Sequence, residues 1–464
     1  MKPILVLQRR RMGDLILSFP LFLWLRRTFP DNPIQVAAEE HFFQPLMSLS
    51  PQVGYVPWSE AGTLLQRDYR LVLNLSAGGQ AEELAGRARA EEKLGPILLN
   101  GARRVLGRWQ LYRQSLIQNN RYNRFHWADL NALDLVPLAE LRGTAFAEPR
   151  RLPPGEVRVG LFLGASEPSK RPGVAFWAEL ARALLDRGLR PALLGGPAER
   201  GLGAEVKRIA AAPLLDLCGK LGLKELAAAG QTFQLLVTPD TGPMHLAAWT
   251  GLRVLNLSMG NVNPWETGPY QPGHLVLRPT ASCALGCWSC TRGDTRCRGA
   301  FSARRTASLV QSMLTGPDER LERLTPPGLA LSRTDRDPSG LYRLARLDRR
   351  APGAHRLLSR FWQAYHGHRF GLWDEARPRA AWAELAAAQP RLAEAFRSRL
   401  PGLGRGLRLG LSRGALDDAF WTGAPLMLRP LTGFLLPLLQ NSDFSSPAWA
   451  ESLEWLEALL AATR

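Results

Sequence analysis

The sequence contains few cysteines, few lysines and no long apolar run. Five cysteines in 464 residues are too few and too unevenly spread for the dense disulfide framework of a small secreted protein. The longest apolar stretch, Leu15 to Leu25, contains Ser18 and Pro20 and is shorter than the roughly 20 residues of a membrane-spanning helix. The apolar run near the first Met is too short for a signal peptide. We therefore expect a cytoplasmic protein that spans no membrane.

Lysine supplies only six of the 59 basic residues, so the formal charge of +18 comes from arginine. Part of this excess accompanies a general richness in Ala, Leu, Gly and Pro. An excess of this size nevertheless attracts anionic partners such as nucleic acid, phosphorylated ligands or an acidic lipid surface. The sequence shows neither helix-turn-helix nor zinc-finger spacing, and we do not expect nucleic acid as a partner.

The pattern along the chain indicates two α/β domains and a helical extension. Residues 1–150 alternate short β-rich runs with helical stretches, which is typical of a parallel sheet covered by helices. A proline-rich connector follows, and the same alternation returns in residues 155–325. Residues 329–464 show helical periodicity and predict an α-helical extension of unknown role. The runs expected to form strands are Ile4–Leu7, Ile34–Ala37, Leu71–Leu75, Val157–Leu163, Pro191–Leu194, Leu235–Thr238 and Val254–Leu257.

Three strand-to-helix loops carry polar residues, and such loops form the ligand sites of doubly wound sheets. The first contains Asp14 after Gly13, where a carboxylate either caps the helix or meets a ligand. The second runs from Gly164 to Arg171, and its Ser166 and Lys170 suit a phosphate at a helix N-terminus. The spacing is not that of a Walker loop.

The third loop follows the expected strand 235–238. Its Asp and Thr side chains can cap the next helix, its glycine permits close backbone approach, and its histidine on the first helical turn can donate to a phosphate oxygen. A structural histidine is the alternative. The residues concerned are Asp240, Thr241, Gly242, Met244 and His245.

Together these loops resemble glycosyltransferase family 9, the ADP-heptose:lipopolysaccharide heptosyltransferases. The resemblance covers residues 1 to about 320. It rests on Met12-Gly-Asp-Leu, on Lys170-Arg-Pro-Gly-Val-Ala-Phe-Trp, on Leu193-Leu-Gly-Gly-Pro-Ala-Glu199 and above all on Asp240-Thr-Gly-Pro-Met-His245. It implies a GT-B fold, in which two Rossmann-like domains face each other across a cleft. The departures are Pro172-Gly173 and the middle of the stretch 258–270.

The resemblance also implies an inverting transfer that requires no metal or other cofactor. Asp14 would be the general base, and Lys170 with the 240–245 turn would hold the nucleotide diphosphate of a donor such as ADP-heptose. The acceptor would be a lipopolysaccharide core or another surface glycan on an anionic glycolipid. We expect Arg10 and Arg11 to bind its acidic groups, with peripheral contact to the inner membrane surface.

Four cysteines lie close together in the sequence, and they allow a different interpretation of its function. A bound structural Zn²⁺ or an iron–sulfur site is one interpretation of this cluster, and reduced thiols are the other. A non-catalytic module that binds glycans or nucleotides is a third class. The Asp335-Arg336-Asp337 run is interpreted as solvated charge rather than a metal-binding pair. The clustered cysteines are Cys283, Cys287, Cys290 and Cys297.

Overall fold

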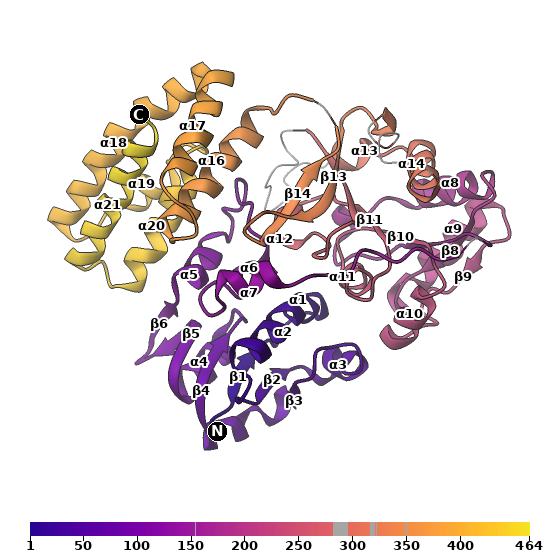
Figure 1. The fold of residues 1–464 in the computed structure, drawn as a ribbon, viewed down its shortest axis with the longest axis horizontal. Coiled ribbons are helices and arrows are strands. Elements are labelled where there is room, and N and C mark those ends of the chain that lie inside the picture. The colour runs from indigo at the N-terminus through magenta and orange to yellow at the C-terminus, as the bar shows by residue number, and fades with distance from the viewer. Residues whose placement is uncertain (154, 282–295, 316–320, 322, 349) are drawn as a thin grey trace.

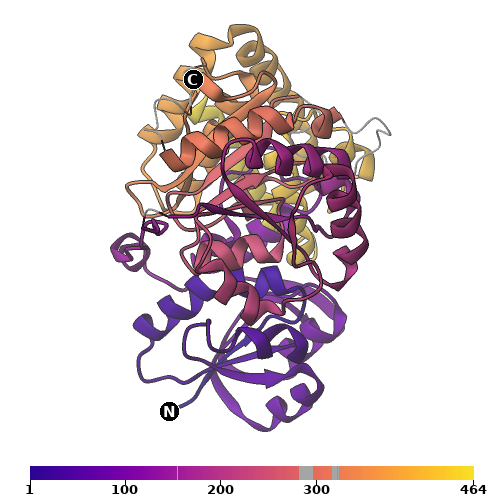
Figure 2. The same ribbon diagram turned by 90° about the vertical axis from the view of Figure 1, so that its right-hand side faces the viewer.

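The computed structural model describes the chain except for residues 154, 282–295, 316–320, 322 and 349. Figure 1 shows a first α/β domain at the N-terminal end, a second α/β domain beside it and a group of helices at the C-terminal end. Figure 2, turned by 90°, separates the first domain from the rest of the molecule. This arrangement confirms the predicted fold class of two doubly wound domains with a C-terminal helical region.

The first domain is built on a sheet of order β3-β2-β1-β4-β5-β6. All pairs are parallel except β5 with β6. The central β1 is fully buried because helices cover both faces, as its uninterrupted apolar sequence predicts. The elements are β1 Ile4–Leu7, α1 Met12–Leu17, α2 Phe19–Thr28, β2 Ile34–Ala38, α3 Glu40–Phe43, η1 Gln44–Leu46, β3 Gly54–Pro57, η2 Trp58–Gln66, β4 Asp68–Asn74, α4 Gly79–Arg87, β5 Arg89–Leu99, β6 Ala102–Leu106, α5 Arg108–Ser115, α6 Trp127–Leu130 and α7 Leu138–Gly143.

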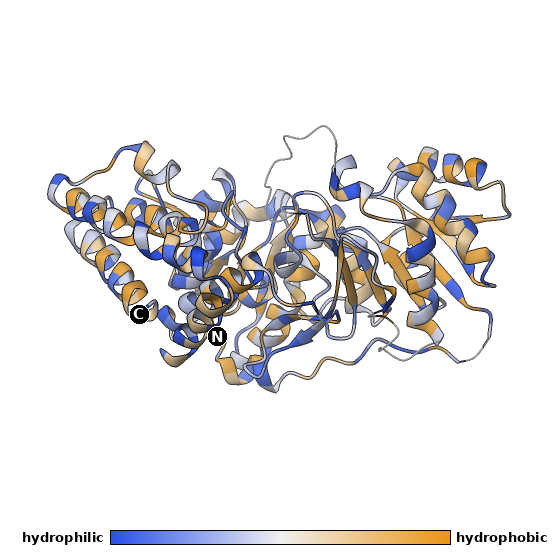
Figure 3. Cartoon of the chain, turned by 90° about the horizontal axis from the view of Figure 1, so that it is seen from above, coloured by the Kyte–Doolittle hydropathy of each residue, from blue (hydrophilic) through white to orange (hydrophobic). Residues whose placement is uncertain are grey.

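The second domain has the sheet order β14-β13-β12-β11-β10-β7-β8-β9. The pairs from β12 to β9 are parallel, whereas β13 and β14 are antiparallel additions at one edge. In Figure 3 the strands of this sheet are mainly hydrophobic in colour. The elements are β7 Arg158–Phe162, η3 Pro168–Lys170, α8 Val174–Leu185, β8 Arg190–Leu194, η4 Pro197–Glu199, α9 Arg200–Ala210, β9 Leu215–Asp216, α10 Leu223–Gly230, β10 Leu235–Thr238, α11 Gly242–Trp249, β11 Val254–Leu257, α12 Pro264–Thr267, β12 Leu275–Pro279, α13 Arg296–Gly299, α14 Ala303–Thr315, β13 Leu329–Arg336 and β14 Tyr342–Arg346.

The helical extension therefore begins at Ala354 and not at residue 329, because the chain first forms the β13–β14 hairpin.

The interpretation of Asp335-Arg336-Asp337 as solvated charge is also wrong. Arg336 stacks over Tyr270 and donates to the carbonyl of Leu141 at 3.0 Å. Asp337 accepts from the N–H groups of Ser339 and Leu341 and closes the hairpin turn. The charged side chains of this run thus have structural partners.

The extension shares one hydrophobic core with the first domain. Tyr112 of α5 contacts the ring of His366, and Trp109 contacts Phe370, with ring centroids 4.9 and 4.6 Å apart. No helix in the described part of the chain is long and apolar enough to cross a membrane. The helices are α16 Ala354–Arg369, α17 Ala376–Ala388, α18 Pro390–Arg413, α19 Asp418–Thr422, α20 Arg429–Asn441 and α21 Ser446–Ala462.

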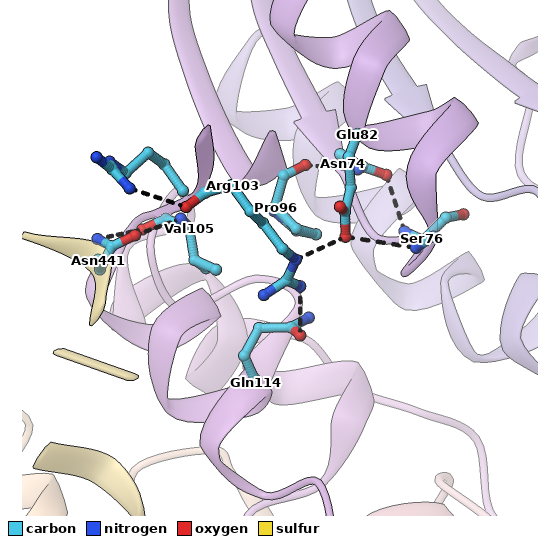
Figure 4. Close-up of polar contacts among 10 residues, drawn as sticks. Asn74, Ser76, Glu82, Pro96, Arg103, Val105, Gln114 and Asn441 are labelled. Carbon is cyan, nitrogen blue, oxygen red and sulfur yellow. Dashed lines mark hydrogen bonds and ion pairs between the residues drawn. The ribbon is translucent and has the colours of Figure 1, made fainter. Parts of the chain in front are cut away.

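The end of α20 covers the free edge of the first sheet. Asn441 accepts from the N–H of Val105 at 2.6 Å and donates to its carbonyl at 3.0 Å, as Figure 4 shows. One side chain thus satisfies both backbone groups of a residue on the edge strand β6. Exposed strand edges are otherwise templates for aggregation.

We expect Asn441→Ala to lower the free energy of unfolding by about 1–3 kcal/mol, because it leaves the paired backbone groups of Val105 without partners. Chemical denaturation with urea measures this change. Gln440→Ala is the matched control, since the neighbouring Gln440 is exposed. Equal stability of the two variants would show that the Asn441 contact contributes nothing.

Candidate active site

Asp14 lies in the first turn of α1, directly after the loop that leaves β1. The residue before the helix, Arg11, has a positive φ of 58°, which is an unfavourable backbone conformation for a residue with a side chain. No side chain caps α1. The Asp14 carboxylate is therefore not used as a helix cap, and its contact with a ligand stays a prediction.

The start of α1 meets the start of α11 from the second domain. A Cβ added to Gly13 would lie 3.4 Å from Cδ2 of His245 and 3.5 Å from Cα of Gly242. A Cβ added to Gly242 would overlap the Met12 side chain. The two glycines thus allow the backbones of both domains to approach closely. This contact brings Asp14 against the Asp240–His245 turn.

Several charges surround Asp14. Burial raises its pKa to about 6, while Arg11 and Arg113 oppose the shift and Asp240 adds to it. Arg113 comes from α5, donates to the carbonyl of Leu75 at 3.0 Å and lies over the ring of Trp127. Its Nε and Nη1 are buried and have no hydrogen-bond partner among the described residues. Sequence reasoning missed Arg113, because only tertiary packing brings α5 to α1.

Asp240 follows β10 and faces the same region. Its Oδ2 accepts from Thr267 Oγ1 at 2.6 Å. Burial raises its pKa to about 6, against the effects of that hydrogen bond, Lys170 and Arg278. Thr241 is the N-cap residue of α11 but makes no side-chain cap. The expectation that Asp240 and Thr241 cap the helix is therefore not met, and Asp240 instead ties the turn to α12.

Lys170 and Ser166 lie together in the loop after β7. Lys170 Nζ is 2.8 Å from Glu167 Oε1 and 3.4 Å from Ser166 Oγ, and its side chain is only 12% exposed. A 3-10 turn, η3, precedes α8 here, so Lys170 lies before the helix and not at its N-terminus. A Cβ on Gly260 would lie 3.2 Å from Lys170 Cγ, which places the lysine against the loop that follows β11.

His245 and Met244 are both buried. Burial lowers the pKa of His245 to about 3, so the imidazole is neutral, and its Nδ1 has no hydrogen-bond partner among the described residues. A neutral ring can still donate one N–H. Met244 is fully buried in a hydrophobic cluster of the second domain, and its side chain contributes packing.

Arg10 and Arg11 are exposed beside Asp14. Arg10 lies against Gly78, in a pocket of about 200 Å³ that precedes α4. Arg9 by contrast is held by Glu39, at 2.8 Å, and lies over the Trp58 ring. Glu82 of α4 accepts from Arg103 at 3.0 Å, as Figure 4 shows. Arg10 and Arg11 are therefore exposed, whereas Arg9 has structural partners.

Glu266 is a further buried acid that sequence reasoning missed. It lies in α12, one residue before Thr267, and accepts from Asn120 at 2.8 Å and from Asn123 at 3.0 Å. Burial raises its pKa to about 8, although both hydrogen bonds oppose the shift. The sequence around Glu266 does not indicate that this carboxyl is buried.

The cysteine hypothesis falls largely on residues that the structure does not describe. Cys283, Cys287 and Cys290 lie outside the described residues. Cys297 is buried in α13. Within the described ranges, no group of three or more His, Cys, Asp or Glu side chains is arranged to hold a metal ion.

Comparison with known proteins supports the sequence-based resemblance. Residues 117–287 match the model of glycosyltransferase family 9 (heptosyltransferase). A glycosyl transferase family 9 structure from Veillonella parvula DSM 2008 is similar, with a TM-score of 0.51 and 20% identity over 68% of this chain and 97% of that one. The structure of the E. coli ADP-heptose lps heptosyltransferase II has a TM-score of 0.50 and 19% identity over 67% of this chain and 98% of that one. No curated protein matches the sequence.

The two structural likenesses show a shared fold of two Rossmann-like domains that face each other. The family match lies in the segment that carries Lys170 and the 240–245 turn. The family match confirms the resemblance to glycosyltransferase family 9 and supports glycosyltransferase activity, while the two solved structures confirm the fold.

Proposed function

We propose that the chain transfers a heptose or a related sugar from a nucleotide-sugar, ADP-heptose in the first instance, to a lipopolysaccharide core or another surface glycan. The transfer is inverting and needs no metal. The observation that carries this proposal is the contact of α1 with α11. This contact sets the Asp14 carboxylate of the first domain against the 240–245 turn of the second domain, and Lys170 lies beside that turn.

In this scheme the acceptor hydroxyl attacks the anomeric carbon of the donor, and the bond from that carbon to the diphosphate breaks. Asp14 takes the hydroxyl proton. Its pKa of about 6 suits this role, because a general base works best when its pKa is near the working pH. A single displacement of this kind inverts the configuration at the anomeric carbon.

The second domain holds the diphosphate. Lys170 supplies a positive charge once the phosphate replaces Glu167, and the first N–H groups of α11 lie at the positive end of the helix dipole. Thr241 and Gly242 present this backbone, Asp240 fixes the turn through Thr267, and His245 donates an N–H. These groups stabilise the charge that develops on the leaving diphosphate.

The acceptor binds on the side of the first domain. Arg10 and Arg11 are exposed next to Asp14, and in this scheme they bind acidic groups of an anionic glycolipid at the inner face of the cytoplasmic membrane. The similar E. coli protein is by its name an ADP-heptose lps heptosyltransferase, which supports both the donor and the kind of acceptor.

We expect Asp14→Asn to retain ADP binding but to lose transfer by at least about 100-fold, because it removes the base and leaves the second domain unchanged. Isothermal titration with ADP and a single-turnover assay with ADP-heptose measure the two properties. Turnover close to that of the unsubstituted protein would reject the role of Asp14.

The raised pKa of Asp14 predicts two opposite pH effects. Transfer needs the ionised carboxylate, so kcat/KM should fall as the pH decreases through about 6. The folded state binds this proton more tightly than the unfolded state, so ionisation of Asp14 destabilises the fold as the pH rises. Asp14→Asn should therefore raise Tm at about pH 8 and have little effect at about pH 4. A higher Tm at the acidic pH alone would contradict the burial of this carboxylate.

We expect Lys170→Ala to weaken ADP binding about tenfold or more while adenosine binding changes little, because the lysine acts on phosphate charge. Equilibrium titrations with both ligands test this. Lys207→Ala, at an exposed position on α9, is the matched control for the lost charge. Equal losses for ADP and adenosine would place Lys170 away from the diphosphate.

A further inference from the structure

A second pocket lies where the extension joins the two domains. Its volume is about 540 Å³, and it is bounded by the segment 121–124 of the first domain, the segment 262–265 after β11, the strands β12 to β14 and the start of α16. In Figure 1 these elements meet between the second domain and the extension. The residues of the proposed transfer site, Asp14, Lys170 and the 240–245 turn, do not line it.

The lining of this pocket is strongly basic. Two carboxylates lie nearby but do not line it: Asp348 pairs with Arg346 of the lining, and Glu384 lies 2.6 Å from Arg360. The described lining contains no carboxylate, and it includes six arginines: Arg121, Arg124, Arg278, Arg346, Arg350 and Arg356.

Arg124 is the central cation of this lining. Its guanidinium stacks over the Trp265 ring at 4.0 Å, while its Nε and Nη1 are buried and have no hydrogen-bond partner among the described residues. Burial, together with the charges of Arg356 and Arg360, lowers its pKa to about 9, so the group still carries its charge at neutral pH. Like charges held this close are costly unless an anion lies between them.

The start of α16 adds a further attraction for anions. The cap residue is Gly353, no side chain caps this helix, and its first turn contains no acidic residue. The free N–H groups and the helix dipole therefore place a partial positive charge beside the pocket. His355 in the same turn is fixed by a contact of its Nε2 with the Arg121 carbonyl at 2.8 Å.

A part of the remaining wall is apolar. Val262, Val276, Ala330 and Leu344 line it together with Trp265. Such a surface favours a ligand that carries an organic part in addition to its charge. The volume and the mixture of arginines with apolar side chains exceed what a lone inorganic ion requires.

We propose that this pocket binds an organic phosphate, with Arg124, Arg356 and the N-terminus of α16 around the phosphate group and the apolar wall against the organic part. The site is separate from the transfer site and does not depend on the proposed function. It links the extension to both domains, because its wall contains residues of all three parts.

Phenyl phosphate and inorganic phosphate are the probes, in isothermal titrations of the full chain near neutral pH. We expect phenyl phosphate to bind more tightly than inorganic phosphate. Arg356→Gln should weaken its binding by about tenfold or more, because it removes one charge-assisted contact. Lys170→Ala should leave this binding unchanged, whereas it weakens ADP binding. Arg408→Gln, at an exposed position on α18, is the control for lost positive charge.

Thermal unfolding of the ligand-free variants distinguishes binding from a structural role. Arg356→Gln should not lower Tm, since it relieves repulsion in the pocket. The proposal is overturned if phenyl phosphate does not bind, if Lys170→Ala removes its binding, or if Arg356→Gln lowers Tm and leaves binding intact. Sedimentation with phosphatidic acid vesicles assigns the source of the phosphate. Weaker sedimentation of Arg356→Gln than of Arg408→Gln indicates a lipid headgroup, and equal sedimentation indicates a free ligand.

Discussion

The close backbone approach of α1 to α11 is the constraint on which the candidate site depends. A Cβ at position 242 would displace the end of the Met12 side chain, and at Gly13 the neighbouring domain is already at contact distance. This approach has an electrostatic cost, since it puts Asp14 and Asp240 within range of each other and burial raises the pKa of each to about 6. Arg11 and Arg113 offset that cost on one side, and Lys170 and Arg278 offset it on the other. Two acidic side chains thus lie between basic ones, as the proposed proton transfer and release of a diphosphate require.

The extension belongs physically to the same assembly. It shares a hydrophobic core with the first domain, and His355 of α16 holds the backbone of Arg121. In the same segment, Asn120 and Asn123 bind Glu266 of α12, and the next residue, Thr267, binds Asp240. A continuous series of short contacts thus runs from the extension to the candidate site. These contacts help to position the turn at 240–245.

The sequence predicts the parallel core of the fold well, and the reasons are local. Leu235–Thr238 and Val254–Leu257 are continuous apolar runs bounded by turn residues, and both are strands with these bounds. The hairpin β13–β14 was not predicted, because Leu329–Arg336 ends in charged residues whose partners lie far away in the sequence. Within the site, Asp14 and Lys170 follow strands and stand out for that reason. Arg113 and Glu266 carry no such signal, since their places depend on helices that meet only in the folded chain.

The arginine excess has more than one physical explanation. Arg9 and Arg336 lie over aromatic rings and bind fixed acceptors, so a part of the excess is structural and its charge is locally satisfied. The guanidinium group suits such places because it is planar, stacks on rings and presents several donors at once. Arg124 also stacks on a ring, yet two of its donors find no acceptor and the nearest charges are mostly of the same sign. Compositional bias can supply arginines, but it does not gather them in one pocket at a helix N-terminus whose described lining contains no carboxylate. The distribution of the charge, more than its total, therefore distinguishes the arginines that hold the fold from those placed to meet an anion.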